Sequence, residues 1–193
     1  MAVRRAPQAI LIVGLIAFSW PMMMLVHEAG HVIGALATGG RVQRVIWHQL
    51  VFSRTDVAPN PSPKVEVWAG PILGAALPAL LAAMVASFRL KTSYLFVAFA
   101  GFCLLINGLY IGWGLIDPVG DAHEMIRLGV PRWSMLAFGL IATISGIWLL
   151  DRVSPSLGFG DRPKRVRADH AALVLAIAAL VWIVGLVFGN RGT

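Results

Sequence analysis

Long apolar runs separated by short polar segments make up most of the chain. Five runs approach or exceed the roughly 20 residues that an α-helix needs to cross a bilayer, and they cover about 8–38, 68–88, 94–116, 133–150 and 171–188. The first run is too long for one straight crossing, so Pro21 is expected to kink it or split it in two. The pattern predicts an all-α membrane protein with about five transmembrane helices. Four crossings and a re-entrant first segment are the alternative.

The segment between the first two runs has a different pattern. Its first part, "RVQRVIWHQLVFSRTDV", alternates and is rich in β-branched residues, which predicts a short hairpin or strand at the membrane surface. The following "APNPSPK" is typical of an extended linker. The stretch 45–52 would then offer a strand edge on which an unwound substrate could pair.

Composition agrees with the apolar pattern. The chain of 193 residues is 58% hydrophobic and 13% charged, whereas a soluble domain carries about 25% charged residues. The net charge of +7 comes from basic residues scattered through the loops, so it does not indicate nucleic-acid binding. Because Lys and Arg divide almost evenly between alternate loops, the positive-inside rule leaves the orientation open. We expect one integral membrane domain over 1–193, with the N-terminal apolar run retained as a helix.

Polar side chains interrupt the first apolar run at "MMMLVHEAGHVIGALATGG". His27, Glu28 and His31 form the pattern H-E-x-x-H. On a helix, residues four apart share a face, so both imidazoles can reach one metal ion while the glutamate serves as a base. Charged groups in a membrane helix cost about 2.5–3.5 kcal/mol each by insertion scales, so a function is favoured. A buried structural network of the three side chains is the alternative.

A hydrolytic zinc site needs a third protein ligand and an open position. Asp117 and Asp121 follow the third apolar run closely, in "LIDPVGDAHEMIRLG". Further candidates are His123 in the same stretch and Cys103, His48 and His170 elsewhere in the chain. The residues alone leave the third ligand open.

Three stretches together resemble the site-2 protease family of intramembrane zinc metalloproteases. They are "HEAGHVIGALATGG", the Gly-Pro-containing "VWAGPILGAAL", and "NGLYIGWGLIDPVGDAHEMIRLG" with its aspartates. The family places H-E-x-x-H on one core helix and an aspartate, usually in a D-G step, on a later one. This chain has D-P and D-A instead, and it would be a divergent member that lacks a PDZ domain.

The resemblance implies a three-helix protease-like core over about 8–130 and two additional helices over about 133–190. It implies Zn²⁺ as the cofactor and Glu28 as the catalytic base. The zinc ligands would be His27, His31 and Asp121, because a sequence like the family's short helix follows Asp121; Asp117 and then His123 are the alternatives. Residues implied to contact substrate are Asn107, Gly70 and Pro71.

The expected activity is therefore that of a zinc metalloendopeptidase that cuts transmembrane proteins in or near their helices. Its partners would be such a substrate, the lipid bilayer and an accessory membrane protein, with no nucleic acid. A bacterial inner membrane is the expected location, given the small helical design and the lack of organelle signals. A non-catalytic zinc-binding membrane scaffold is the alternative function, and a metal transporter is disfavoured by the few polar residues in the last two runs.

Overall fold

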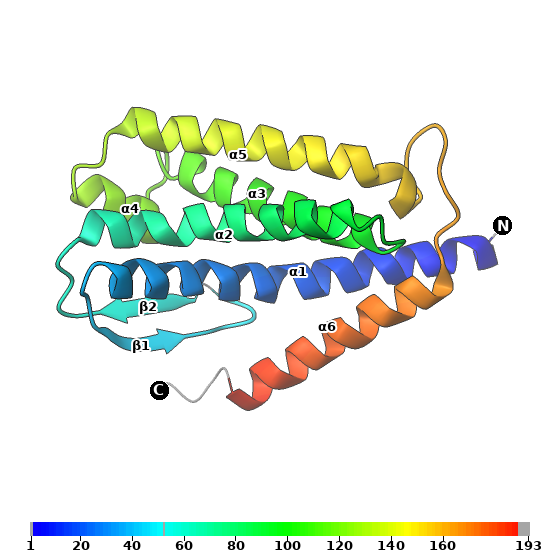
Figure 1. Ribbon diagram of the computed structural model, residues 1–193, viewed down its shortest axis with the longest axis horizontal. Coiled ribbons are helices and arrows are strands. Elements are labelled where there is room, and N and C mark those ends of the chain that lie inside the picture. The colour runs from blue at the N-terminus through cyan, green and yellow to red at the C-terminus, as the bar shows by residue number, and fades with distance from the viewer. Residues whose placement is uncertain (1, 52, 189–193) are drawn as a thin grey trace.

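The computed structural model describes residues 2–51 and 53–188, and most of them are helical (Figure 1). The elements follow one another as α1 (Ala2–Ala37), β1 (Val42–Ile46), β2 (Arg54–Val57), α2 (Pro63–Ser87), α3 (Ser93–Trp113), α4 (Gly120–Arg127), α5 (Arg132–Val153), η1 (Ser154–Leu157) and α6 (Ala168–Phe188). In this described part, α1, α2, α3, α5 and α6 are the five helices long and apolar enough to span a membrane. The prediction of five long apolar helices is confirmed, and their crossing of a membrane stays a prediction.

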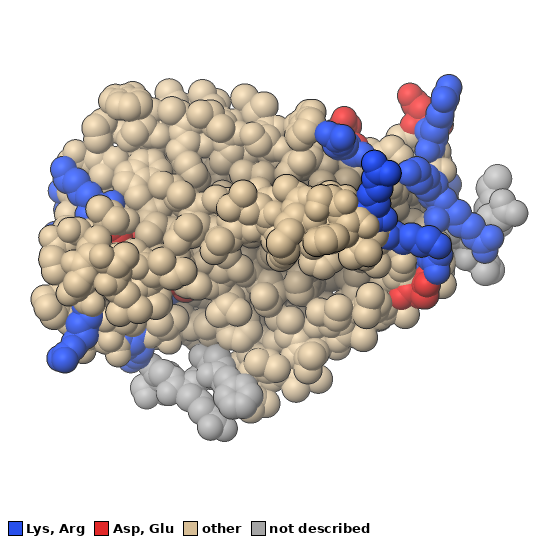
Figure 2. Space-filling model, viewed as in Figure 1, with Lys and Arg blue, Asp and Glu red and all other residues tan. Residues whose placement is uncertain are grey.

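The surface has the character of an integral membrane protein. Large apolar side chains on three different helices, Leu80, Ile141 and Leu186, are each more than 65% exposed, which is the arrangement expected where lipid is the solvent. On the face shown in Figure 2, Lys and Arg side chains gather at the two ends of the molecule and leave the middle without them.

The first apolar run forms one continuous helix through Pro21, so the expectation that it splits in two was wrong. Proline cannot donate an N–H to the carbonyl four residues before it, here that of Ala17. The indole Nε1 of Trp182 on α6 donates to this carbonyl at 2.9 Å. A side chain from the far end of the sequence thus replaces the missing helical bond.

The central helices lie side by side. Helix α1 packs against α2 and α6, α2 packs against α3, and α3 packs against α5 (Figure 1). Close approach of α1 and α2 depends on small residues, because a Cβ atom on Gly30 would lie 2.4 Å from the carbonyl oxygen of Ala69, and one on Gly34 would lie 2.5 Å from its Cβ. The start of α2 is therefore pressed against the His27–His31 segment of α1.

The predicted hairpin exists as a two-stranded antiparallel sheet, in which Val42 pairs with Val57 and Ile46 with Arg54. It folds back along α1 (Figure 1), so that Trp47 Nε1 donates to the carbonyl of Pro21 at 3.1 Å.

The strand edge predicted at 45–52 is largely wrong. Residues 47–51 belong to the loop between the strands, and Phe52 lies outside the described residues. The ladder ends at the pair of Ile46 and Arg54, and the loop that follows is attached to α6 instead, where Gln49 Nε2 donates to the carbonyl of Trp182 at 2.8 Å. The predicted linker after the hairpin is also shorter than expected, since α2 already begins at Pro63.

Replacing Trp182 by Phe should lower the free energy of unfolding by about 1–2 kcal/mol, because the Ala17 carbonyl loses the indole donor. With Pro21→Ala, residue 21 supplies its own N–H, so Trp182→Phe should then have a smaller effect. A double-mutant cycle on the detergent-solubilised protein measures this coupling. Trp133→Phe, at a side chain that is 72% exposed, is the control. Equal losses with and without Pro21 would contradict the explanation.

Candidate metal centre

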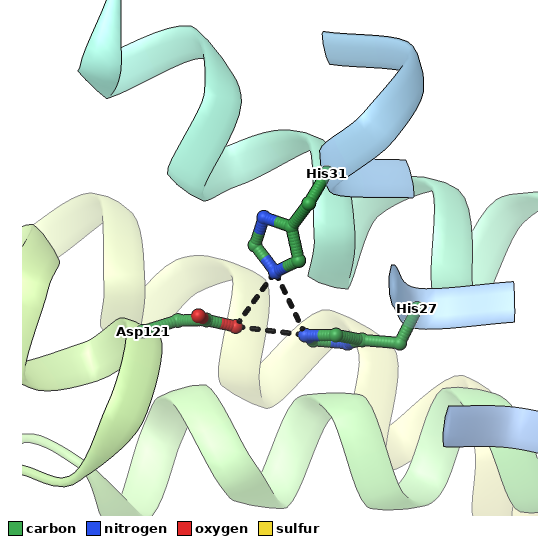
Figure 3. Close-up of side chains that lie close together, drawn as sticks. All are labelled: His27, His31 and Asp121. Atoms are coloured by element: carbon green, nitrogen blue, oxygen red, sulfur yellow. Dashed lines mark hydrogen bonds and ion pairs between the residues drawn. The ribbon is translucent and has the colours of Figure 1, made fainter. Parts of the chain in front are cut away.

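Two side chains from α1, His27 and His31, and one from α4, Asp121, meet at one point (Figure 3). Nε2 of His27 lies 2.8 Å from Oδ2 of Asp121, and Nε2 of His31 lies 3.3 Å from the same oxygen. The two Nε2 atoms are 3.2 Å apart. The three residues form the group within the described chain whose ligand atoms are close enough to hold a metal ion together.

The size and chemistry of this triangle fit zinc. Ligand atoms at about 2.0–2.1 Å from a tetrahedral zinc ion lie about 3.3 Å from one another, and the sides of the triangle measure 2.8, 3.2 and 3.3 Å. Two imidazoles and one carboxylate form a ligand set found in zinc enzymes, with a fourth position left open. The identity of the metal is a further step, taken below as part of the proposed function.

Asp121 is held in an ionised form. Burial raises the pKa of this carboxyl group, but hydrogen bonds from the imidazoles of His27 and His31 lower it by more, so its pKa lies well below the ordinary value. A metal ligand must be deprotonated to bind, and the carboxylate meets that requirement.

Helix α4 carries Asp121 to the two histidines. Its Ala122 and Met125 are completely buried in a cluster with Val67 and Ile111, which fixes the helix against α2 and α3. The backbone N–H of Asp121 donates to the hydroxyl of Tyr110 at 2.8 Å.

A glycine is required directly before the aspartate. Gly120 has φ +52°, in the left-handed region, and a Cβ atom there would lie 2.1 Å from the hydroxyl oxygen of Tyr110. The close contact with Tyr110 and the strained backbone both exclude a side chain, so this turn fixes the direction from which Asp121 approaches.

Hydrogen bonds on the far side of each imidazole decide which nitrogen faces the site. The amide of Asn107 donates from Nδ2 to the carbonyl of Cys103 at 2.9 Å, so its Oδ1 accepts from Nδ1 of His27 at 2.7 Å. On His31, Nδ1 lies 3.0 Å from the carbonyl of Glu66 and 2.9 Å from its Oε1. If a metal ion replaced the hydrogen bonds to Asp121, each ring would keep its proton on Nδ1 and direct the lone pair of Nε2 at the ion.

Glu28 lies beside the ligands without joining them. It is 3% exposed, and its Oε2 accepts a hydrogen bond from the Thr55 hydroxyl at 2.7 Å. Strand β2 of the hairpin therefore orients the carboxylate that the sequence pattern marks as a base.

A cavity of about 770 Å³ adjoins all of these groups, within the range of about 300–1,000 Å³ usual for ligand sites. Polar residues of its lining include Thr55, Asn60 and Glu66, in addition to the His27–His31–Asp121 group and Glu28. Apolar residues of its lining include Trp20, Met23, Met24, Ile106 and Leu109. The cavity thus combines a group that could hold a metal ion, a further carboxylate and a mostly apolar lining.

The structure separates the candidates for the third ligand. Asp121 joins the two histidines, whereas Asp117 and His123 are exposed and lie outside the metal-binding group of the described chain.

The residues predicted to contact substrate have packing roles. Asn107 lines the cavity and also orients His27. A Cβ atom on Gly70 would lie 2.2 Å from Nε2 of His31, so the absence of a side chain at Gly70 leaves space for the imidazole of His31. Pro71 is fully buried. Contact of these three residues with substrate stays a prediction.

Sequence reasoning missed Thr55, Glu66 and Tyr110. A signal for Glu66 was present, because an acidic residue stands in the first turn of an otherwise apolar helix, four residues before Gly70. The sequence pattern did not mark Tyr110 or Thr55. The contact of Thr55 with Glu28 depends on how the hairpin folds back along α1.

Comparisons with known proteins add no identification: the chain matches no protein-family model, and neither the curated proteins nor the solved structures gave a match.

Exchanging each aspartate for alanine tests the ligand set. Asp121→Ala should lose the metal that co-purifies with the chain, because two imidazoles alone hold zinc weakly. Asp117→Ala, the matched control, should keep about one metal ion per chain. Elemental analysis of both purified variants beside the wild type gives the answer. Metal retained by the first variant and lost by the second would reverse the assignment.

Proposed function

We propose that the chain is a membrane-embedded zinc metalloendopeptidase of the site-2 protease type, which hydrolyses peptide bonds in or near transmembrane helices. The observation that carries the proposal is the position of Glu28 in the same cavity as the His27–His31–Asp121 group, surrounded by apolar helices. A site built for metal storage alone has no need of an additional buried carboxylate.

The division of labour among the helices supports the same proposal. The ligands and their partners come from α1, α2, α3 and the short α4 that follows, which corresponds to a three-helix core. Helices α5 and α6 contribute no ligand within the described chain. One departure from the family pattern is that the glycine precedes the aspartate, as Gly120–Asp121, instead of following it.

The chemistry divides between the metal and Glu28. Bound zinc supplies a Lewis acid that makes water nucleophilic near neutral pH. The carboxylate of Glu28 takes a proton from the attacking water and then delivers it to the leaving amine. The Thr55 hydroxyl orients this carboxylate throughout. His27 and His31 keep their Nδ1 protons in hydrogen bonds to Asn107 and Glu66 respectively.

The cavity indicates what kind of substrate would enter. Leu109 of α3 lines the cavity and is also 47% exposed, which supports entry of substrate from the side of the helices. An apolar segment of a membrane protein could enter from the bilayer, and it would have to unwind because helical hydrogen bonds shield the scissile amide. Such a substrate, an accessory membrane protein and the lipid itself are the proposed partners, and a bacterial inner membrane is the proposed location.

Glu28→Gln tests the catalytic assignment. The amide keeps the size of the side chain and does not ligate the metal, so zinc content should equal that of the wild type. Cleavage should fall by about 10²–10⁴-fold, because the amide cannot accept the proton. The measurement compares membrane-protein fragments by mass spectrometry in cells that produce the wild type or the variant.

The matched control is Asp169→Asn, which changes an exposed carboxylate that is paired with Arg167 and lies outside the cavity lining. It should leave cleavage near the wild-type level. If Glu28→Gln yields the same fragments as the wild type, Glu28 is not the base. If the wild type yields none while both proteins retain the same membrane partners, the chain is a zinc-binding scaffold.

A further inference from the structure

A second carboxylate stands directly behind one of the metal ligands. The side chain of Glu66 is 13% exposed, and its Oε1 lies 2.9 Å from Nδ1 of His31. Nδ1 is the ring nitrogen that faces away from the metal position, because Nε2 of the same ring faces Asp121 at 3.3 Å. Glu66 therefore lies outside the His27–His31–Asp121 group, and its contact with that group is through His31.

The fold forces this contact. Glu66 belongs to the first turn of α2, and a Cβ atom on Gly34 of α1 would lie 3.3 Å from its Cα. Because the helices approach so closely there, the side chain of Glu66 lies in contact with the ring of His31. Its second oxygen is also engaged, since Nδ2 of Asn60 donates to Oε2 at 3.4 Å.

The two histidines are supported differently. His27 donates from Nδ1 to a neutral amide oxygen of Asn107 at 2.7 Å, whereas His31 has a carboxylate at the equivalent position. A hydrogen bond to a charged acceptor is roughly twice as strong as a neutral one, and it raises the electron density that the opposite ring nitrogen offers to a metal.

We propose that Glu66 is a positioning residue that fixes the ring and tautomer of His31 and makes it the stronger of the two imidazole ligands. The inference rests on the metal centre of the proposed function and not on hydrolysis. The alternative is that the side chain of Glu66 only stabilises the start of α2, as an acidic residue in the first turn stabilises any helix. In that case the backbone carbonyl of Glu66, at 3.0 Å, would be the sole acceptor for Nδ1 of His31.

Cobalt binding distinguishes the two roles, because Co²⁺ takes zinc sites and its visible absorption reports the ligand field. Metal-free wild type, Glu66→Ala and Glu66→Gln are titrated with Co²⁺ in detergent, and zinc affinity follows from competition with a chelator. Glu66→Ala should weaken binding of both metals by about 10–100-fold and shift the cobalt bands. Glu66→Gln keeps an acceptor without the charge, so it should lose less affinity.

The control is Asp169→Ala, which removes an exposed carboxylate paired with Arg167 outside the cavity lining and should bind as the wild type does. Binding by Glu66→Ala within twofold of the wild type, with an unchanged spectrum, would overturn the proposal in favour of the backbone carbonyl. If Glu66→Ala fails to fold, Glu66→Gln decides: a weaker affinity with shifted bands supports the role, and wild-type values overturn it.

Failure of the metal centre itself has a separate signature. If the wild type binds neither Co²⁺ nor Zn²⁺, both the metal centre and the role of Glu66 fall. If it binds both metals with the expected differences among the variants but cleaves nothing, the role of Glu66 stands and only the peptidase function fails.

Discussion

The oxygen Oδ2 of Asp121 lies within 2.8 and 3.3 Å of the two imidazole nitrogens, in surroundings that are otherwise largely apolar. Ionisable groups in such surroundings need partners, because each would otherwise cost about 2.5–3.5 kcal/mol by insertion scales. Helix α1 places three of them within five residues. The neighbouring elements each bring one polar side chain to meet them: Glu66 from α2, Asn107 from α3, Asp121 from α4 and Thr55 from β2. Much of the packing around α1 therefore provides hydrogen-bond partners for its three ionisable side chains.

Helix α6 supports the surroundings of the site through two contacts, one with α1 and one with the hairpin. Trp182 of α6 completes the hydrogen bonding of α1 at Pro21, and Gln49 ties the hairpin tip to α6. The hairpin so anchored is the element that brings Thr55 to Glu28. Helix α6 supplies no ligand within the described chain, and its link to the site runs through the hairpin that carries Gln49 and Thr55.

Features set by local periodicity could be predicted from the sequence. Five apolar runs gave five long helices, and the i, i+4 spacing placed His27 and His31 on one face. The short helix at Asp121 was expected only from the resemblance to the site-2 protease family, and α4 (Gly120–Arg127) is that helix. Features set by distant neighbours could not be predicted. The continuity of α1 through Pro21 depends on a tryptophan on the last helix, and the role of Glu66 depends on two glycines that let α1 and α2 nearly touch. Whether the site cuts peptides is a question of chemistry that neither periodicity nor packing answers.

The proposed centre holds one zinc ion between two imidazoles and a carboxylate. X-ray absorption at the zinc edge of the purified wild-type protein tests this arrangement most directly, because imidazole rings give a distinctive multiple-scattering pattern. We expect two histidine nitrogens at about 2.0–2.1 Å and oxygen at about 2.0–2.2 Å in a four-coordinate site. A spectrum with sulfur in the first shell, with no imidazole pattern, or with six oxygens as for a loosely bound surface ion would contradict it.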